Sequence, residues 1–395
     1  MPYAPILLTS LLSGLSMPLI IGLAQRRDLY DKLDERKIHT GKIARLGGVG
    51  VFGAFVAVVL LLPFIVDSGL LRSLQSRLQK LLPLILGAAI MHLTGLVDDL
   101  SGGKVHAIPK LIFQITAALL VVLGGYRFKA FGFHSDILAS QLSWFSVILT
   151  IGWIIGISNA LNLIDGMDGL AGGISFIVAL AYGAFYQLTG DTENAFICLS
   201  LAGAVAGFLF ANFPAPKAKI FMGDSGSLFL GFMLATIPFL GQTAGQEELF
   251  QIGLLPAMLV LAIPMTDTLC AIGRRLKAHV GITTPDRGHI HHKLLDHGFS
   301  PIRILFMVYL VTVFECFDFL VARYLPDLNG FLAELIGFCV VGIFFRYGFS
   351  LMPMTKTAQQ TKTNPMVRVS RESTESAESA ELAESAQGDS PGDSL

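Results

Sequence analysis

Two adjacent aspartates, Asp98 and Asp99, occur in the segment GLVDDL at the end of a long apolar run. Paired carboxylates repel each other, and at a membrane boundary they require a cation, a proton or a basic partner. A site that handles phosphate groups would supply all three. Two aspartates in a solvated loop would give the same pattern, so this pair alone leaves a structural and a functional interpretation equally open.

A second block, NALNLIDGMDGLAGG, holds asparagines and aspartates at helical spacing. Asn159 and Asn162 are three residues apart, and so are Asp165 and Asp168, so helical continuity would place each pair on one face. The neighbouring glycines allow a ligand to approach the backbone closely. Carboxylate and amide oxygens suit a hard cation such as Mg²⁺, which takes few protein ligands and adds phosphate oxygens. A glycine-rich turn between two helices is the simpler alternative, and it leaves the acids and amides unexplained.

The third block, ANFPAPKAKIFMGDSGSLFLG, places Asn212 at the end of one apolar run and Asp224 at the start of the next. Aspartate is a good N-cap, so helix capping alone would justify Asp224. A helix N-terminus beside glycine and serine is also a place for phosphate, or for a metal that bridges to phosphate. The capping and the binding interpretations are compatible.

Basic side chains and histidines gather in the fourth block, TTPDRGHIHHKLLDHGFS. Arg287, His289, His291 and His292 could donate hydrogen bonds to a pyrophosphate and stabilise the charge that develops during phosphoryl transfer. The spacing matches no standard zinc pattern, and the four cysteines lie in apolar runs elsewhere. An inert loop is the alternative. Lys110, at the start of the apolar run after the aspartate pair, could hold a phosphate or only extend toward the membrane interface.

The composition indicates which elements must bring these blocks together. The 395 residues are 53% hydrophobic and 14% charged, with a mean hydropathy of +0.65, whereas soluble domains carry about 25% charged residues. We therefore expect an all-α, polytopic integral membrane protein, and nothing indicates nucleic-acid binding. Apolar runs near the roughly 20 residues that cross a bilayer predict about eleven transmembrane helices. These runs cover residues 3–24, 46–66, 81–97, 110–126, 143–163, 170–189, 195–213, 225–241, 250–272, 302–323 and 328–350.

Lysine and arginine are unevenly distributed over the two sets of connecting loops. One set carries few of them: Arg72, Arg77, Lys80, Arg127, Lys129 and Arg323. The other set is much richer, so it is predicted to be cytoplasmic, with the N-terminus outside and the C-terminus inside. All four polar blocks then face the cytoplasm, where we expect an active-site cleft. A transporter is a minor alternative, because proton relays usually lie near the bilayer midplane.

Two segments differ from the apolar runs. After residue 353 the sequence turns to Ser, Glu, Thr, Gln and Ala, so we predict a membrane domain over residues 1–353 and a disordered acidic cytoplasmic tail over residues 354–395. Residues 67–80 have apolar positions at helical spacing and are expected to lie along the outer membrane surface.

The four blocks, in this order and on one face, resemble the polyprenyl-phosphate N-acetylhexosamine-1-phosphate transferases, from about Asp34 to about Ser300. The segment HIHH at 289–292 is similar to the WecA-like branch of that family. The MraY-like branch typically carries three consecutive histidines followed by an acid, and an MraY-like phospho-MurNAc-pentapeptide transferase is the alternative. One departure is HTGKIARLGG, where relatives often have a Pro-Thr-Pro type stretch, which leaves the contacts of the first loop unassigned.

The resemblance implies an activity and a location. N-acetylglucosamine 1-phosphate would pass from UDP-N-acetylglucosamine to undecaprenyl phosphate, with release of UMP. The product would be the first lipid-linked intermediate of a cell-envelope polysaccharide, such as lipopolysaccharide O-antigen, made at the bacterial inner membrane. Ten or eleven helices around a cytoplasmic cleft and a tendency to form homodimers are also implied.

The resemblance further implies roles for individual residues. Asp98 would orient or deprotonate the lipid phosphate, and Asp99 would support the geometry of metal and phosphate. Asn162 and Asp224 match positions that bind Mg²⁺, with Mn²⁺ as an alternative cation. Further catalytic roles fall to Asp165, Asp168, His289, His291 and His292, and substrate binding falls to Lys110, Asn159, Asn212 and Arg287.

Two other chemistries fit parts of the pattern. A covalent aspartyl intermediate on Asp98 or Asp99 would be a different route to the same product. The CDP-alcohol phosphotransferases also place Asp-Gly pairs in a membrane, but they are expected to show an Ala-Arg shortly after the first pair. The segment DGMDGLAGG has none.

Overall fold

The computed structural model describes residues 4–27, 29, 43–65, 69–129, 143–214, 217–244, 252–281, 284, 286, 288–325 and 327–350. Within these ranges the chain is helical and forms no strand, apart from one isolated bridge between Ala44 and Ile220. The division at residue 353 stays a prediction, because the acidic tail lies outside the described residues.

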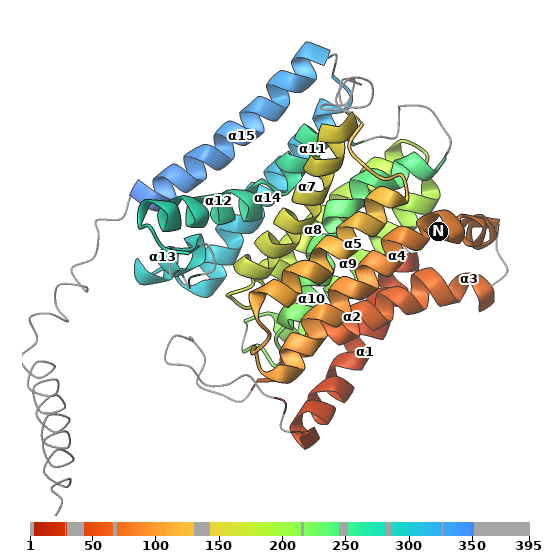
Figure 1. Cartoon of the computed structure of the whole chain (residues 1–395), viewed down its shortest axis with the longest axis horizontal. Helices are drawn as coiled ribbons and strands as arrows, with labels where there is room; N and C mark the ends of the chain where they lie inside the picture. The colour runs from red at the N-terminus through yellow and green to blue at the C-terminus, as the bar shows by residue number, and fades with distance from the viewer. Residues whose placement is uncertain are drawn as a thin grey trace, which may run out of the picture. The chain divides into compact units, whose positions relative to one another are not determined.

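The helices follow one another along the chain as Figure 1 shows. They are α1 (Ala4–Arg27), α2 (Gly47–Val56), the π-helical η1 (Ala57–Leu61), α3 (Leu62–Ile65), α4 (Gly69–Ser101), α5 (Ala107–Leu123), α7 (Ser143–Ile164), α8 (Leu170–Leu188), α9 (Thr192–Asn212), α10 (Gly223–Thr236), the 3₁₀-helical η2 (Ile237–Ala244), α11 (Leu254–Val260), α12 (Ala262–Lys277), α13 (Ile290–Asp296), α14 (Pro301–Ala322) and α15 (Asp327–Ser350).

Many of these helices are long and apolar enough to cross a membrane. Among the described residues 8 helices meet that condition, or up to 9 if α11 and α12 count as one bent span. Two shorter apolar helices, Gly47–Leu61 and Ala107–Leu123, coincide with further predicted runs. The expectation of an all-α polytopic membrane protein is therefore confirmed, whereas a total of eleven spans stays a prediction.

One continuous helix over residues 250–272 was expected, and that expectation is wrong. Two helices, α11 and α12, meet there at 86°. In an unbroken helix the ring of Pro264 would clash with the carbonyl of Val260, and proline has no amide hydrogen to donate. The chain therefore leaves helical geometry at Leu261, and Pro264 falls in the first turn of α12, where no intrahelical donor is needed. The bend lets α12 pack against α7.

A separate surface helix over residues 67–80 is not what the structure shows. The residues from Gly69 onward belong to α4, which continues for 33 residues through the apolar segment to Ser101. Leucine, glutamine, arginine and lysine predominate in the first turns of α4 and favour helix, and the helix continues through Pro83 into the apolar span.

Helix α10 occupies the centre of the bundle and packs against α4, α7 and α2. Glycines on two of these neighbours allow the backbones to approach closely. A Cβ atom at Gly48 would lie 2.2 Å from the main-chain nitrogen of Gly226, and one at Gly95 would lie 2.3 Å from the carbonyl carbon of Asp224. Small residues at helix crossings are the usual means of tight packing in membranes. They fix the first turn of α10 against α2 and α4.

Replacing Gly48 by alanine is expected to destabilise the protein by about 1–3 kcal/mol, because the added methyl group meets main-chain atoms that cannot move aside. Gly53, on the same helix, provides a matched control, since a Cβ atom added there would have no neighbour within 4 Å. Gly53→Ala should be neutral or stabilising by up to about 1 kcal/mol. Thermal unfolding in detergent measures both, and equal midpoints for the two variants would contradict this packing.

Candidate functional site

The polar blocks meet at one end of the bundle, called here the site end. Asp98 and Asp99 close α4, and Lys110 lies in the first turn of α5. Asn162 lies in the last turn of α7, and Asp224 lies in the first turn of α10. Successive helices run in opposite directions, so these helix ends come together. The expectation that the blocks converge is met by direct contacts among their side chains.

Asp99 caps helix α10 from a different helix. Its Oδ1 accepts a hydrogen bond from the main-chain N–H of Asp224, and its Oδ2 accepts one from that of Ser225, each at 2.9 Å. The first N–H groups of a helix have no partner within the helix, and the positive end of the helix dipole favours a carboxylate. Asp99 is completely buried, at 0% side-chain exposure. This carboxylate therefore fixes where α10 begins.

Asp224 was expected to be able to cap α10 itself, and that interpretation is wrong. It lies inside the first turn, and its side chain makes no capping hydrogen bond. Because Asp99 already satisfies the helix N–H groups, the Asp224 carboxylate is directed to basic partners instead. Lys110 Nζ lies 2.7 Å from Asp224 Oδ2, and Arg45 Nη2 lies 3.5 Å from Asp224 Oδ1.

Lys110 joins the two carboxylates that flank it. Its ammonium donates to Asp98 Oδ2 and to Asp224 Oδ2, at 2.7 Å each. The other oxygen of Asp98 accepts from the main-chain N–H of Val105 at 3.0 Å. Two carboxylates, those of Asp98 and Asp224, thus flank the ammonium, while the guanidinium of Arg45 lies 3.9 Å from Asp99 and 3.5 Å from Asp224. We refer to these five residues as the carboxylate cluster.

The loop between α7 and α8 adds two more carboxylates to the same end. Asp165 is half-buried and Asp168 is buried. Burial raises the pKa of Asp165 well above its usual range, and the nearby charge of Asp224 raises it further, although Arg45 acts in the opposite direction. Negative charge is therefore crowded on this side of the site, and a bound cation would relieve it.

The two asparagines of α7 make contacts at different depths. Asn162 donates from Nδ2 to Ser227 Oγ at 2.9 Å, which orients the amide so that its carbonyl oxygen is the atom left for a cation. Asn159, one turn further from the site end, forms a reciprocal amide pair with Gln114, at 2.7 and 3.2 Å. Gln114 is itself one turn beyond Lys110. Asn159 thus holds α7 against α5, and its predicted contact with substrate stays a prediction.

Asn212 and Tyr309 hold the same residue of the α7–α8 loop from two sides. Asn212 Oδ1 accepts from the N–H of Gly169 at 2.8 Å, and its Nδ2 donates to the carbonyl of Ile220 at 2.9 Å. Tyr309 donates its hydroxyl to the carbonyl of Gly169 at 2.5 Å. Gly169 has φ +80°, a conformation that glycine adopts without strain. Asn212 therefore positions the loop, while its predicted role in substrate binding stays untested.

A buried aspartate of α12 anchors the histidine block. Asp267 Oδ2 lies 2.7 Å from His289 Nδ1, and Asp267 Oδ1 accepts from the main-chain N–H of Ile290 at 2.9 Å. An ionised carboxylate can only accept, so His289 donates from Nδ1 and directs Nε2 away from Asp267. This arrangement fixes the ring orientation of His289, as second partners of functional histidines generally do.

His291 connects the histidine block to the α7–α8 loop. It is 1% exposed, neither ring nitrogen has a hydrogen-bond partner, and its ring lies against Gly166, where a Cβ atom would come within 2.5 Å of Nε2. Burial lowers the pKa of His291 to about 3, and the neighbouring His292 contributes in the same direction. At neutral pH His291 is therefore an uncharged imidazole that can still donate one hydrogen bond.

An ion pair supports the start of the histidine block. Arg274 donates to Asp286 Oδ2 at 2.6 Å, and Asp286 Oδ1 accepts from the N–H of Gly288 at 2.7 Å. Burial alone would raise the pKa of Asp286, but these hydrogen bonds outweigh it and lower the value overall. Arg287, predicted to bind substrate, lies outside the described residues.

The donor set fits a hard cation that binds together with phosphate. In the described part of the chain, no three His, Cys, Asp or Glu side chains come together as a metal-binding group. Mg²⁺ commonly takes one or two carboxylates and completes its shell with water and phosphate oxygens. Asp224, whose Oδ1 faces Arg45 only at 3.5 Å, and the carbonyl oxygen of Asn162 are suitable donors. The carboxylates at this end of the bundle outnumber the basic side chains of the cluster, and they supply the negative charge that a bound cation requires.

Three residues of this site were not singled out in the sequence. Arg45 lies in the first-loop segment ARLGG, three residues before Gly48, which packs on α10. Asp267 had a detectable signal, because an ionisable residue within an apolar run is by default a functional candidate. Tyr309 had none, since a tyrosine in a membrane helix far along the chain predicts no contact with a loop.

The fold and the site define a multi-pass helical membrane protein with a charged cluster at one end of its bundle. Residues 81–242 match the model of the family described as glycosyl transferase family 4. The chain is 34% identical over 296 residues to a probable undecaprenyl-phosphate N-acetylglucosaminyl 1-phosphate transferase of Bacillus subtilis (strain 168), over 74% of this chain and 77% of the relative.

Other bacterial relatives have similar names. A decaprenyl-phosphate N-acetylglucosaminephosphotransferase of Mycobacterium tuberculosis is 37% identical over 297 residues, which cover 70% of this chain and 71% of the relative. The undecaprenyl-phosphate alpha-N-acetylglucosaminyl 1-phosphate transferase of Escherichia coli (strain K12) is 26% identical over 342 residues, or 86% of this chain and 88% of the relative. The chain therefore belongs to the polyprenyl-phosphate N-acetylhexosamine-1-phosphate transferase family, a family of membrane phosphotransferases.

Asp267→Asn is expected to lower kcat by about 10²-fold with little loss of stability. An asparagine keeps the shape, but its NH₂ group would face His289 Nδ1 and shift the ring proton to Nε2. Asp296→Asn removes the same charge from an exposed position on α13 and serves as the control. Steady-state kinetics and thermal unfolding of both variants test the contact. Full activity in Asp267→Asn would show that the orientation of His289 does not matter.

Proposed function

We propose that this protein transfers N-acetylglucosamine 1-phosphate from UDP-N-acetylglucosamine to undecaprenyl phosphate, releasing UMP and forming the first lipid-linked intermediate of a cell-envelope polysaccharide. The names of the relatives from Bacillus subtilis and Escherichia coli support the sugar and the lipid. The HIHH segment supports the WecA-like branch over the MraY-like one.

The observation that carries the proposal is the position of Lys110 between two carboxylates. Its ammonium lies 2.7 Å from both Asp98 and Asp224, and Arg45 approaches Asp224 from the other side. Two anionic reactants must meet for this reaction, so the site has to attract phosphate while keeping its own charges apart. The ammonium of Lys110 and the guanidinium of Arg45 separate the negative charges of the carboxylates that they contact. Each of them can also attract substrate, because it can exchange a carboxylate contact for a phosphate oxygen.

In the proposed reaction an oxygen of the lipid phosphate attacks the β-phosphorus of the UDP-sugar. The new bond joins that oxygen to the β-phosphorus, and the bond from the β-phosphorus to the bridging oxygen breaks, so UMP leaves with the bonding electron pair. Lys110 holds the incoming phosphate, and Asp98 either orients it or accepts its proton. His289 and the neutral His291 donate hydrogen bonds toward the departing phosphate.

Direct displacement is the route that the geometry favours over a covalent aspartyl intermediate. Both oxygens of Asp99 accept main-chain N–H groups of α10. Both oxygens of Asp98 accept as well, from Lys110 and from the N–H of Val105. A carboxylate held by two such contacts would have to give one up before it attacked phosphorus.

Asp224 and Asn162 are the residues that would hold Mg²⁺, and the nearby Asp165 would contribute negative charge. When bound, the cation offsets the charge of the pyrophosphate and of the departing UMP, and Mn²⁺ is an alternative. Asp99 and Ser227 act on the two donors indirectly, since Asp99 fixes the first turn of α10 and Ser227 orients the Asn162 amide.

The site end is proposed to face the cytoplasm of a bacterial inner membrane. Helix α1 closes with Arg26 and Arg27, and α12 closes with Arg274, Arg275 and Lys277, all at the site end. Positive charge in short loops marks the cytoplasmic side. This orientation places the N-terminus outside and the C-terminus inside. Assembly as a homodimer remains an expectation drawn from the family.

Purified protein incubated with undecaprenyl phosphate, Mg²⁺ and radiolabelled UDP-N-acetylglucosamine should yield labelled lipid and an equal amount of UMP. Addition of EDTA should abolish turnover, and Mg²⁺ should restore it, because without the cation the two anionic reactants are no longer screened from each other. Thin-layer chromatography of the lipid fraction measures the product.

The donor control separates the two branches of the family. UDP-MurNAc-pentapeptide should give no lipid product under the same conditions. Turnover with that donor and none with UDP-N-acetylglucosamine would contradict the proposal, as would undiminished activity in EDTA.

A further inference from the structure

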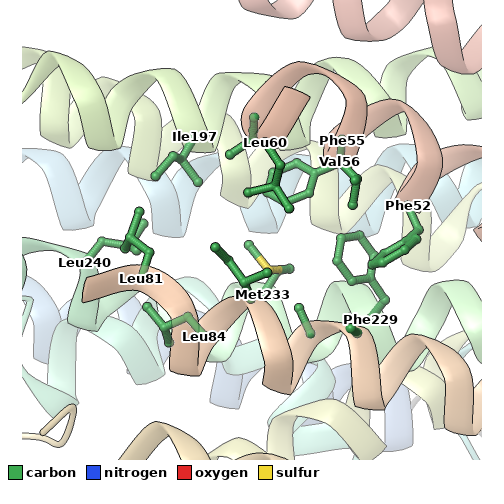
Figure 2. A pocket seen from close by; sticks show the side chains of 14 residues that line it. Phe52, Phe55, Val56, Leu60, Leu81, Leu84, Ile197, Phe229, Met233 and Leu240 are labelled. Atoms are coloured by element: carbon green, nitrogen blue, oxygen red, sulfur yellow. The ribbon is translucent and has the colours of Figure 1, made fainter. Parts of the chain in front are cut away.

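An apolar groove lies on the side of the bundle between α2–η1 and α4 (Figure 2). It holds a cavity of about 160 Å³, and carbon atoms make up almost all of its lining. Figure 2 shows the side chains arranged from Leu81 and Leu240 at one end to Phe52 and Phe229 at the other. None of these residues belongs to the carboxylate cluster.

The groove exists because two helices share a neighbour without filling the space between them. Both α2 and α4 pack on α10, but they pack little on each other. Met233 and Phe229 of α10 form the buried floor. The rim is half-exposed and includes Val56 and Leu60 on one side and Ala89 on the other. The π-helical turn η1 lies along this rim, and such turns are frequent at functional sites.

Water is a poor occupant for this space. A buried water needs polar partners, and cavities of this size lined by carbon stay dry or take apolar ligands. The groove opens beside α4, whose segment Leu81–Ser101 is long and apolar enough to cross a membrane, so the medium at its rim is hydrocarbon. We propose that an acyl chain of a phospholipid from the leaflet at the end of the bundle opposite the site occupies this groove.

The direction of the groove supports a chain that enters from that leaflet. Leu81 lies at the start of the apolar part of α4, at the end opposite the site, and Ala89 lies two turns closer to the site. The distance between them along α4 is about 12 Å, close to the roughly 15 Å of hydrocarbon in one leaflet. The turns of α4 that precede Leu81 contain three basic residues in the sequence, Arg72, Arg77 and Lys80.

At the end nearer the site, the groove is lined by aromatic residues that lie on or pack against the first turns of α10, which carry part of the carboxylate cluster. Phe52 stacks on His92, with ring centroids 4.0 Å apart and an interplanar angle of 5°, and packs edge-on against Phe229. His92 Nδ1 lies 3.2 Å from the carbonyl oxygen of Ser225, whose N–H donates to Asp99. A chain that fills the groove presses on Phe52 and Phe229, and it thereby steadies the first turns of α10.

The direct test uses the full-length protein in phosphatidylglycerol nanodiscs that contain phosphatidylglycerol with a diazirine on its acyl chain. After irradiation, peptide mass spectrometry should find label on Phe229 or Met233, which an outside lipid cannot reach. Label confined to outward residues of α4, such as Leu86 and Leu93, would overturn the proposal. Added undecaprenyl phosphate should leave the label on α10 unchanged, and its displacement would identify an isoprenoid chain as the occupant instead.

A groove-filling variant gives a second, independent readout. Ala89→Phe puts a ring at the rim, so the thermal midpoint of the delipidated protein in detergent should no longer rise when phosphatidylglycerol is added. Ala333→Phe makes the same change on α15, away from the groove, and should keep the full rise seen in the wild type. An equal rise in both variants would contradict the assignment, as would loss of the rise in both.

Discussion

The capping of α10 by Asp99 is the interaction on which the site depends. A helix that starts in the middle of a membrane protein leaves N–H groups without partners, and leaving such groups unsatisfied in a buried setting is unfavourable. Asp99 satisfies the N–H groups of Asp224 and Ser225 from α4, so the position of one helix end determines the position of the next. Gly48 and Gly95 make this possible, because a larger side chain at either position would push α10 away. Asp224 is thereby released from capping and directed toward Lys110 and Arg45.

Charged side chains are distributed unevenly around the first turn of α10, and their distribution explains which ligands the site can bind. Lys110 and Arg45 balance part of the charge of the three carboxylates beside them, whereas Asp165 and Asp168 add further negative charge nearby. The two basic side chains suit a phosphate, and the excess of carboxylates suits a cation that arrives with phosphate. The histidine block, anchored by Asp267, closes the site with hydrogen-bond donors of which His291 is uncharged. These are the components that a phosphosugar transfer between two anions requires.

The sequence predicted the helical membrane fold, because the hydropathy of each segment indicates a membrane helix. It also predicted that the polar blocks converge, because successive helices alternate in direction and bring those blocks to the same side. It could not show that Asp99, not Asp224, caps α10, since that contact joins residues more than 100 positions apart. The bend at Leu261 could have been found from Pro264, whereas the continuity of α4 could not, because Pro83, a residue type that usually ends or kinks a helix, lies inside it. Asn159 and Asn212 have amides that are engaged with Gln114 and with Gly169 and Ile220, respectively, and only the packing reveals these contacts.

Comparison of Asp99→Asn with Asp98→Asn tests the central claim most directly. An asparagine at position 99 would turn an NH₂ group toward one of two fixed main-chain N–H donors, so the free energy of unfolding should fall by about 1–3 kcal/mol. At position 98 the partly exposed Lys110 can keep its contact with Asp224, so stability should change less, although both variants should lose activity. Thermal unfolding of the two variants beside the wild type measures the difference. A midpoint for Asp99→Asn equal to that of the wild type would show that Asp99 does not hold α10 in place.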